Sequence, residues 1–205
     1  MTTLDHDPTD HRPRPAPTAL LLTGSLLVAP LVYLVADSLY AARGWDDADA
    51  GAVHVLGGIA YAFVLVRLSS WAQGWLSAAT LVTGLVGAAG NVAHGFNTIH
   101  VSLGAVDLVD TSGPGAIIKP LGLFFPLALL AGALVVARLG RRLNAALVAA
   151  AGLAWPVAHI GNVAWLAVAV NLLLVVGLAP LVTYGAAADT SASIARTART
   201  TRARS

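Results

Sequence analysis

Residues 143–184 form one apolar block of 42 residues, and its length constrains the fold more than any other feature of the chain. As a single α-helix the block would be about 63 Å long at 1.5 Å per residue, whereas the hydrocarbon core of a bilayer is about 30 Å thick. The block must therefore fold back on itself. Pro156, Gly161 and Asn162 disfavour a continuous helix, so the sequence predicts one helix at 143–160 and another at 162–184.

Four more apolar segments precede this block, and each is long enough to cross a bilayer. The chain is 57% hydrophobic and only 11% charged, whereas a soluble domain carries about 25% charged residues. The sequence therefore predicts an all-α integral membrane protein whose transmembrane domain covers residues 18–185. The six predicted transmembrane helices lie at about 18–42, 51–71, 75–103, 116–138, 143–160 and 162–184.

The two ends of the chain differ in composition from this central domain. Residues 1–17 are polar and rich in proline, and we expect them to be disordered. Residues 186–205 are rich in Ser, Thr, Ala and Arg and show no apolar period, so this tail is also predicted to be disordered. Its arginines are expected to bind anionic lipid of the inner leaflet weakly, at about 1 kcal/mol per basic residue near the surface.

The positions of Arg and Lys predict that both termini are cytoplasmic, because cytoplasmic loops carry an excess of basic residues. With six helices only Arg43 and Lys119 lie outside, whereas with five helices the tail arginines would also lie outside and the excess would vanish. The bias of the chain toward Ala, Val, Leu, Gly and Arg is typical of GC-rich bacterial genomes. We therefore predict a multi-pass protein of the bacterial cytoplasmic (inner) membrane. The basic residues on its inner side would be Arg12, Arg14, Arg67, Arg138, Arg141, Arg142, Arg196, Arg199, Arg202 and Arg204.

The composition also excludes several chemistries. The chain has no cysteine, so it has no disulfide, thiolate metal site, iron–sulfur cluster or cysteine nucleophile. All ten acidic residues are aspartate, which excludes glutamate-based catalysis. The basic residues are clustered rather than spread over a general surface, so we expect no binding of nucleic acid. The segment "TSGPGAIIKP" at 111–120 is rich in glycine but lacks the lysine–serine spacing of a phosphate loop.

Polar side chains concentrate in the predicted outer half of the bundle. The segment "GNVAHGFNTIH" at 90–100 places two asparagines and two histidines within an otherwise apolar helix. Because polar and ionisable side chains are costly inside a membrane, such residues are candidates for function. The candidate residues of the outer half are Asp37, His54, Asn91, His94, His100, Lys119, His159 and Asn162.

Helical spacing gives the segment 75–103 a polar face. At 100° per residue its small and polar residues fall within one narrow stripe, which should face other helices because small residues permit close packing. His100 lies about 120° from His94 around the helix axis, so a single metal ion would not readily take both from a regular helix. The predicted stripe consists of Thr80, Gly84, Gly87, Asn91, His94 and Thr98.

Our leading hypothesis is a polar pocket that opens toward the outer leaflet and binds a small ligand, a transition metal or haem. Asn91 and His94 would form its floor, and Asp37 and Lys119 would be its charged neighbours. The predicted metal ligands are His54, His94 and His159. The mouth of the pocket would be formed by His54, His100, His159 and Asn162.

Three alternatives stay open on the sequence. The first is a membrane enzyme acting on a lipid or isoprenoid, with a histidine as general acid or base, Asp37 as its partner and Lys119 as a headgroup clamp. The second is a small transporter, although the inner half offers few polar side chains beyond Asn171. The third is a structural or assembly protein, in which the histidines only pack and Gly84 and Gly87 contact a partner. A homo-oligomer is compatible with each of them.

Overall fold

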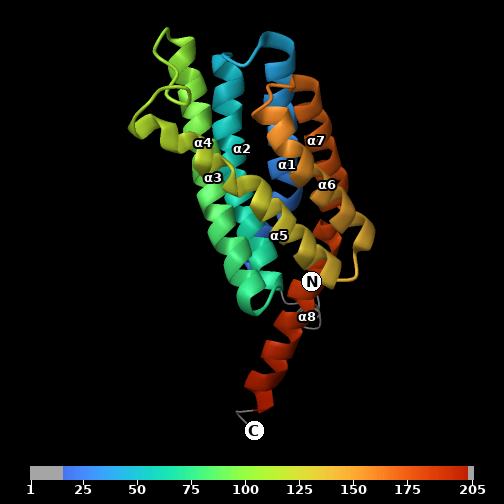
Figure 1. Ribbon diagram of the computed structural model, residues 1–205. Coiled ribbons are helices and arrows are strands. Elements are labelled where there is room, and N and C mark those ends of the chain that lie inside the picture. Colours follow the sequence, from blue (N-terminus) through green and yellow to red (C-terminus); the bar gives the residue numbers. More distant parts are fainter. Residues whose placement is uncertain (1–15, 203–205) are drawn as a thin grey trace, which may run out of the picture.

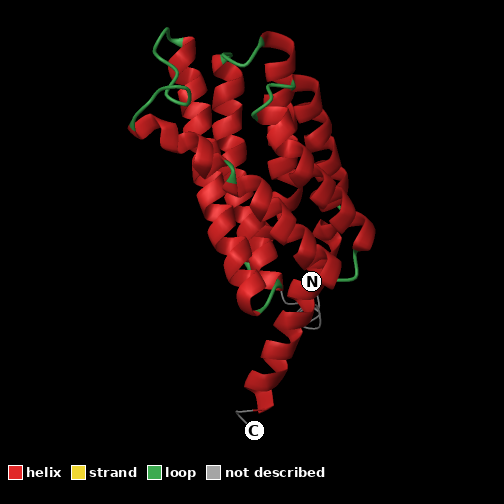
Figure 2. Cartoon of the chain, in the orientation of Figure 1, coloured by secondary structure: helices red, strands yellow, loops and turns green. Residues whose placement is uncertain are grey.

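The computed structural model describes residues 16–202, and within this range the chain consists of helices joined by loops, with no strand (Figure 2). The prediction of an all-helical protein is confirmed. Five segments are long and apolar enough to cross a membrane, as expected for a multi-pass membrane protein. They are Pro17–Arg43, Ala48–Trp71, Gly74–Ser102, Pro114–Arg138 and Ala164–Ser191.

The first three helices form an antiparallel layer. They are α1 (Pro17–Arg43), α2 (Ala48–Trp71) and α3 (Gly74–Ser102), and they run side by side in Figure 1. Their bounds agree with the predicted segments to within three residues. The start of α2 is earlier than predicted because the Asp47 carboxylate accepts a hydrogen bond from the backbone N–H of Ala50, which caps the helix.

The predicted helix 116–138 is broken, which corrects the sequence prediction. The chain forms a 3-10 turn η1 (Pro114–Ile117), a short α4 (Ile118–Gly122) and then α5 (Phe124–Arg138), which runs obliquely across the bundle in Figure 1. Pro126 explains the break, because proline lacks an N–H and its ring collides with the carbonyl four residues earlier, here that of Gly122.

The break lies against a glycine surface on α3. A Cβ atom on Gly90 would overlap the backbone of Leu121 and Gly122, and one on Gly87 would overlap the backbone of Phe125. Only glycine therefore lets α4 and α5 approach α3 this closely. The predicted stripe does face other helices, since all its members except the half-buried His94 are buried: Thr80, Gly84, Gly87, Asn91 and Thr98.

The apolar block folds back where the sequence predicts. Helix α6 (Arg142–His159) and helix α7 (Ala164–Leu178) form an antiparallel pair, and Asn162 in the turn adopts a left-handed conformation with φ of 54°. Asparagine tolerates this conformation better than most residues. Pro156, however, lies inside α6 rather than in the turn.

The C-terminal part of the chain differs from the prediction. Helix α7 ends at Leu178 because Pro180 cannot continue its hydrogen-bond pattern, and α8 runs from Leu181 to Arg202. The tail expected to be disordered is therefore helical as far as Arg202, since alanine and arginine are good helix formers. The segments 1–15 and 203–205, which carry the rest of the disorder predictions, lie outside the described residues.

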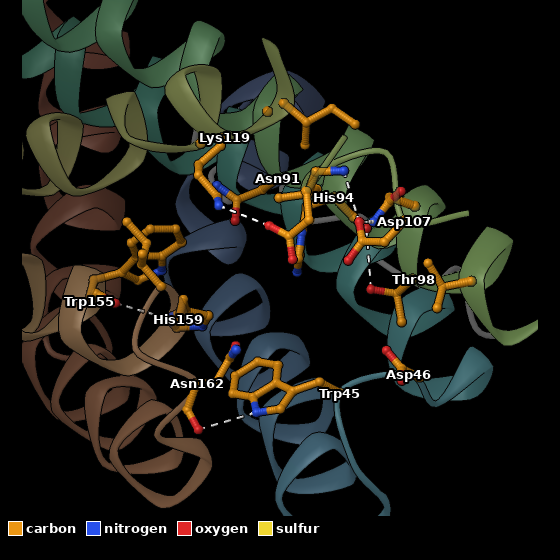
Figure 3. A pocket seen from close by; sticks show the side chains of 18 residues that line it. Trp45, Asp46, Asn91, His94, Thr98, Asp107, Lys119, Trp155, His159 and Asn162 are labelled. Atoms are coloured by element: carbon orange, nitrogen blue, oxygen red, sulfur yellow. Dashed lines mark hydrogen bonds and ion pairs between the residues drawn. The ribbon is translucent and has the colours of Figure 1, made fainter. Parts of the chain in front are cut away.

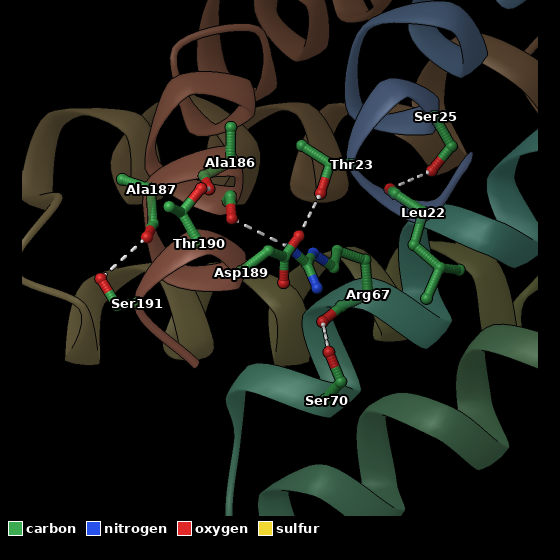
Figure 4. A network of polar contacts seen from close by, with 11 residues as sticks. Leu22, Thr23, Ser25, Arg67, Ser70, Ala186, Ala187, Asp189, Thr190 and Ser191 are labelled. Atoms are coloured by element: carbon green, nitrogen blue, oxygen red, sulfur yellow. Dashed lines mark hydrogen bonds and ion pairs between the residues drawn. The ribbon is translucent and has the colours of Figure 1, made fainter. Parts of the chain in front are cut away.

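A buried ion pair docks α8 at the end of the bundle opposite the α1–α2 turn (Figure 4). Arg67 of α2 donates to the Asp189 carboxylate of α8, and it also donates to the carbonyl of Gly185 over 3.2 Å. Thr23 of α1 donates to the same carboxylate over 3.3 Å. The guanidinium lies 4.8 Å from the ring centre of Trp71. The start of α8 is thus part of the bundle and not a loose tail.

The glycine surface yields a paired test. We expect Gly90→Ala to destabilise the protein by about 1–3 kcal/mol, because the new methyl group meets backbone that cannot move aside. Gly24→Ala in α1 is the matched control, since a Cβ at Gly24 meets nothing within 4 Å and the helix propensity gained is the same. The free energy of unfolding in detergent micelles measures both. Equal stability of the two variants would contradict the close approach.

Candidate functional site

Five of the eight polar residues predicted for the outer half line a cavity of about 310 Å³ at the end of the bundle that carries the α1–α2 turn (Figure 3). The cavity is enclosed by this turn, the second half of α3, the loop 103–113, α4 and the end of α6. Its volume falls at the small end of the range for ligand pockets. Its polar and aromatic lining consists of Trp45, Asp46, Asn91, His94, Asn97, Thr98, Asp107, Asp110, Lys119, Trp155, His159 and Asn162.

Several predicted residues do line this cavity. Figure 3 shows His159 and Asn162 on the side of α6 and the turn that follows it, and Asn91 and His94 on α3 across the cavity. Lys119 of α4 also lines the cavity. The sequence therefore identified side chains from three separate elements that the fold brings together.

His54 lies behind the cavity instead of at its mouth, which corrects the prediction. Its side chain is 1% exposed, and its Nε2 lies 3.2 Å from Oδ1 of Asn91. The Asn91 amide nitrogen donates to the carbonyl of Gly87, so Oδ1 is the acceptor and His54 Nε2 carries the hydrogen. His54 also packs on Tyr33, with ring centres 4.6 Å apart. Its role here is to hold Asn91 in place.

Asp37 is also buried, and it connects three helices. Its carboxylate is 1% exposed, accepts from Asn171 Nδ2 of α7 and lies 3.2 Å from Nε2 of His159 at the end of α6. Asp37 therefore lies next to a histidine, the partner that the enzyme alternative assigns to it. Asn171, which the sequence placed in the inner half, is in fact a second partner of Asp37. Neither Asp37 nor Asn171 lines the cavity; both lie behind His159.

The hydrogen bonds of His159 determine where its protons lie. Its Nδ1 is 3.2 Å from the carbonyl oxygen of Trp155, which can only accept, so Nδ1 carries a hydrogen. The contact between Nε2 and Asp37 then contains one further hydrogen, on the imidazole as an ion pair or on the carboxyl as a neutral pair. In both arrangements the unit is neutral overall, which makes a buried acid tolerable. Both nitrogens of His159 are therefore committed to protein atoms.

His94 is the imidazole that the fold leaves available. It lines the cavity, and its ring lies 5.5 Å from that of His54 in an edge-on arrangement. Among the described residues, neither of its ring nitrogens has a hydrogen-bond partner. His100, in contrast, is exposed near the end of α3 and does not line the cavity, because it points about 120° away from His94 around the helix.

The loop 103–113 is held over the cavity by hydrogen bonds that the sequence did not reveal. Asn97 Nδ2 donates to Asp107 over 2.8 Å, and the backbone N–H of Leu108 donates back to Asn97 Oδ1 over 2.9 Å. Lys119 donates to Asp110 over 3.1 Å at the exposed rim. These contacts join α3, the loop and α4 into one wall.

The aromatic walls were also missed. Trp155 stacks on His159 with ring centres 4.4 Å apart and 15° between the planes. Trp45 donates through its indole N–H to the backbone carbonyl of Asn162 over 3.4 Å. The spacing of four residues between Trp155 and His159 places both on one helix face, and this signal was present in the sequence. Nothing local in the sequence indicates that Trp45 approaches Asn162.

The predicted metal ligands are not gathered into one centre. Within the described residues, no group of three or more His, Cys, Asp or Glu side chains is placed to hold a metal ion. His54 is packed behind Asn91. Both ring nitrogens of His159 are occupied, Nδ1 by the carbonyl of Trp155 and Nε2 by the carboxyl group of Asp37. For the same reason His159 is not free to bind a haem iron.

Comparison of the chain with protein-family models, with curated proteins and with solved structures gave no match. Function is therefore inferred from the cavity and from the side chains around it.

The buried Asp37–His159 contact yields a second test. We expect His159→Phe to destabilise the protein by about 3 kcal/mol, because phenylalanine keeps an aromatic ring on Trp155 but leaves the Asp37 carboxylate without its neutralising partner. His100→Phe at an exposed position is the control, with an expected change within about 0.5 kcal/mol. The free energies of unfolding of these two variants, of Asp37→Asn alone and of Asp37→Asn combined with His159→Phe measure the coupling. A strictly additive double variant would contradict a direct interaction.

Proposed function

We propose that this chain is a multi-pass protein of the bacterial cytoplasmic membrane that binds a small polar molecule in the cavity between α3, α4 and α6. The observation that carries this proposal is the combination of a 310 Å³ cavity with the half-buried His94, whose ring nitrogens have no hydrogen-bond partner in the described part of the chain. A polar group near the membrane interior is costly unless it is paired. A ligand that hydrogen-bonds to His94 would supply that partner.

We further propose six membrane crossings with both ends of the chain in the cytoplasm. Helix α6 has 18 residues, equivalent to about 27 Å, and its Val148 and Trp155 are buried in the same core as α5 and α7. With six crossings, the start of α1 and the start of α8 lie on one side, and the hydrogen bond from Thr23 to Asp189 supports this arrangement. The distribution of arginine supports the same orientation. The cavity then opens on the extracytoplasmic side.

The absence of cysteine from the chain makes this orientation easy to test. Single cysteines at Ser112, in the exposed loop 103–113, and at Gln73, between α2 and α3, would report the two sides. We expect a membrane-impermeant maleimide to label Ser112→Cys in intact cells and to label Gln73→Cys only after permeabilisation. The reverse pattern would place the cavity in the cytoplasm and refute the orientation.

The ligand-binding role is tested by what the purified protein retains. We expect mass spectrometry of the small molecules released from the wild-type protein to show a bound species whose occupancy falls about tenfold in His94→Ala, as expected for the loss of one hydrogen bond to a charged group. His100→Ala is the control, because His100 lies outside the cavity lining. Identical sets of released molecules from all three proteins would argue against a ligand at His94.

A membrane enzyme acting on a lipid is the second candidate, and the hydrogen bond between Asp37 and His159 favours it, since an acid commonly orients a catalytic histidine. However, both nitrogens of His159 contact protein atoms, so a general base would have to be His94, which has no carboxylate partner among the described residues. Transport receives less support, because the buried charge of the opposite end, Arg67, is paired with Asp189. We therefore favour ligand binding over catalysis and over transport.

A further inference from the structure

We infer that the ligand of the cavity is a small organic cation, that is, a molecule with a protonated or quaternary amine. This inference rests on the proposed function, because it assigns a chemical class to the ligand of the same cavity. It is supported by the charge of the lining, by the balance of hydrogen-bond donors and acceptors, and by the aromatic walls.

The first observation is the charge of the lining. Three carboxylates, those of Asp46, Asp107 and Asp110, lie around the cavity with a single lysine, Lys119. The lysine is already paired with Asp110 over 3.1 Å. Asp46 and Asp107 have no basic partner in the lining, so they give it a net negative charge. A cleft with apolar walls concentrates such a field and attracts ligands of opposite charge.

The second observation concerns which polar atoms are already used. The indole N–H of Trp45 and one side-chain N–H of each of Asn91 and Asn97 donate to protein acceptors. Thr98 likewise donates its hydroxyl hydrogen to the carbonyl of His94. In contrast, both oxygens of Asp46 and Oδ2 of Asp107 have no hydrogen-bond partner among the side chains that the structure describes. These carboxylate oxygens are therefore available to a cation, and a protonated amine would in addition donate hydrogen bonds to them.

The third observation is the aromatic surface beside these acids. Trp45 and Trp155 both line the cavity, and Asp46 follows Trp45 directly in the chain. The face of a tryptophan attracts a cation more strongly than that of any other side chain, and an aromatic wall beside a carboxylate is the usual setting for recognition of alkylammonium groups. A neutral or anionic ligand would gain neither the attraction to the tryptophan face nor the attraction to the carboxylate.

The same residues favour an organic cation over a metal ion. A bound metal needs several ligand atoms at short distances around one point, and among the described residues no such group exists. An alkylammonium group spreads its charge over a larger surface and does not need converging ligands.

The test uses the full chain in uncharged detergent micelles and follows ligand binding by calorimetry and by thermal shift. The probes are methylammonium, tetramethylammonium and choline, compared with 3,3-dimethylbutan-1-ol, the uncharged isostere of choline, and with acetate and Zn²⁺. We expect at least one ammonium ion to bind and the isostere and acetate to bind at least about tenfold more weakly. Binding should weaken as salt is raised, because exposed charges are screened. Short-chain phosphatidylcholine in a separate arm distinguishes a lipid headgroup from a free amine.

Two variants make the result specific to the cavity. Asp46→Asn combined with Asp107→Asn should weaken binding of the ammonium probe at least about tenfold. Asp49→Asn removes an acid that lies outside the lining and pairs with Arg43, so it should leave binding of the ammonium probe unchanged.

Two results would overturn the cation assignment. One is that the isostere, acetate or Zn²⁺ binds as tightly as the ammonium ions, and the other is that none of the ammonium ions binds. If a neutral molecule still depended on His94, the proposed binding function would survive; if no released molecule depended on His94 either, both would fail.

Discussion

The site depends on one buried carboxylate, that of Asp37. It joins α1 to α7 through Asn171 and to α6 through His159, and these contacts hold one wall of the cavity in place. Because an uncompensated acid in an apolar core is very unfavourable, the three helices cannot separate without exposing it to that cost. This contact occupies Nε2 of His159 while the carbonyl of Trp155 occupies Nδ1, which leaves His94 as the imidazole that a ligand can reach.

The opposite wall depends on a different kind of contact, the close approach of backbones. Gly87 and Gly90 allow the broken segment α4–α5 to lie directly on α3, and the break carries Lys119 to the cavity rim. The α6 wall is therefore positioned by the contacts of a buried carboxyl group, and the wall of α3 and α4 by glycines that lack a side chain. Between them the cavity keeps its polar lining within an otherwise apolar bundle.

The sequence predicted the parts of this structure that follow from periodicity and not the parts that follow from tertiary contact. The lengths of the apolar segments predicted the helices, and Pro156, Gly161 and Asn162 predicted the turn between α6 and α7. Helical spacing predicted the buried stripe of α3. The roles of His54 and Asn171 were missed, because depth along a helix does not reveal which neighbour a side chain meets. The helical α8 was missed as well, because its polar composition does not reveal that Arg67 contacts Gly185 and Asp189 in its first half.

The separation of Asp37 from its partners along the chain has a consequence for biogenesis. His159 and Asn171 follow it by 122 and 134 residues, so α1 leaves the ribosome long before either partner has been made. A lone aspartate within a newly inserted helix costs about 2.5–3.5 kcal/mol on insertion scales, which the apolar remainder of α1 can offset. The Asp37 carboxyl group therefore has no partner in the nascent chain until α6 and α7 have been made and complete the assembly.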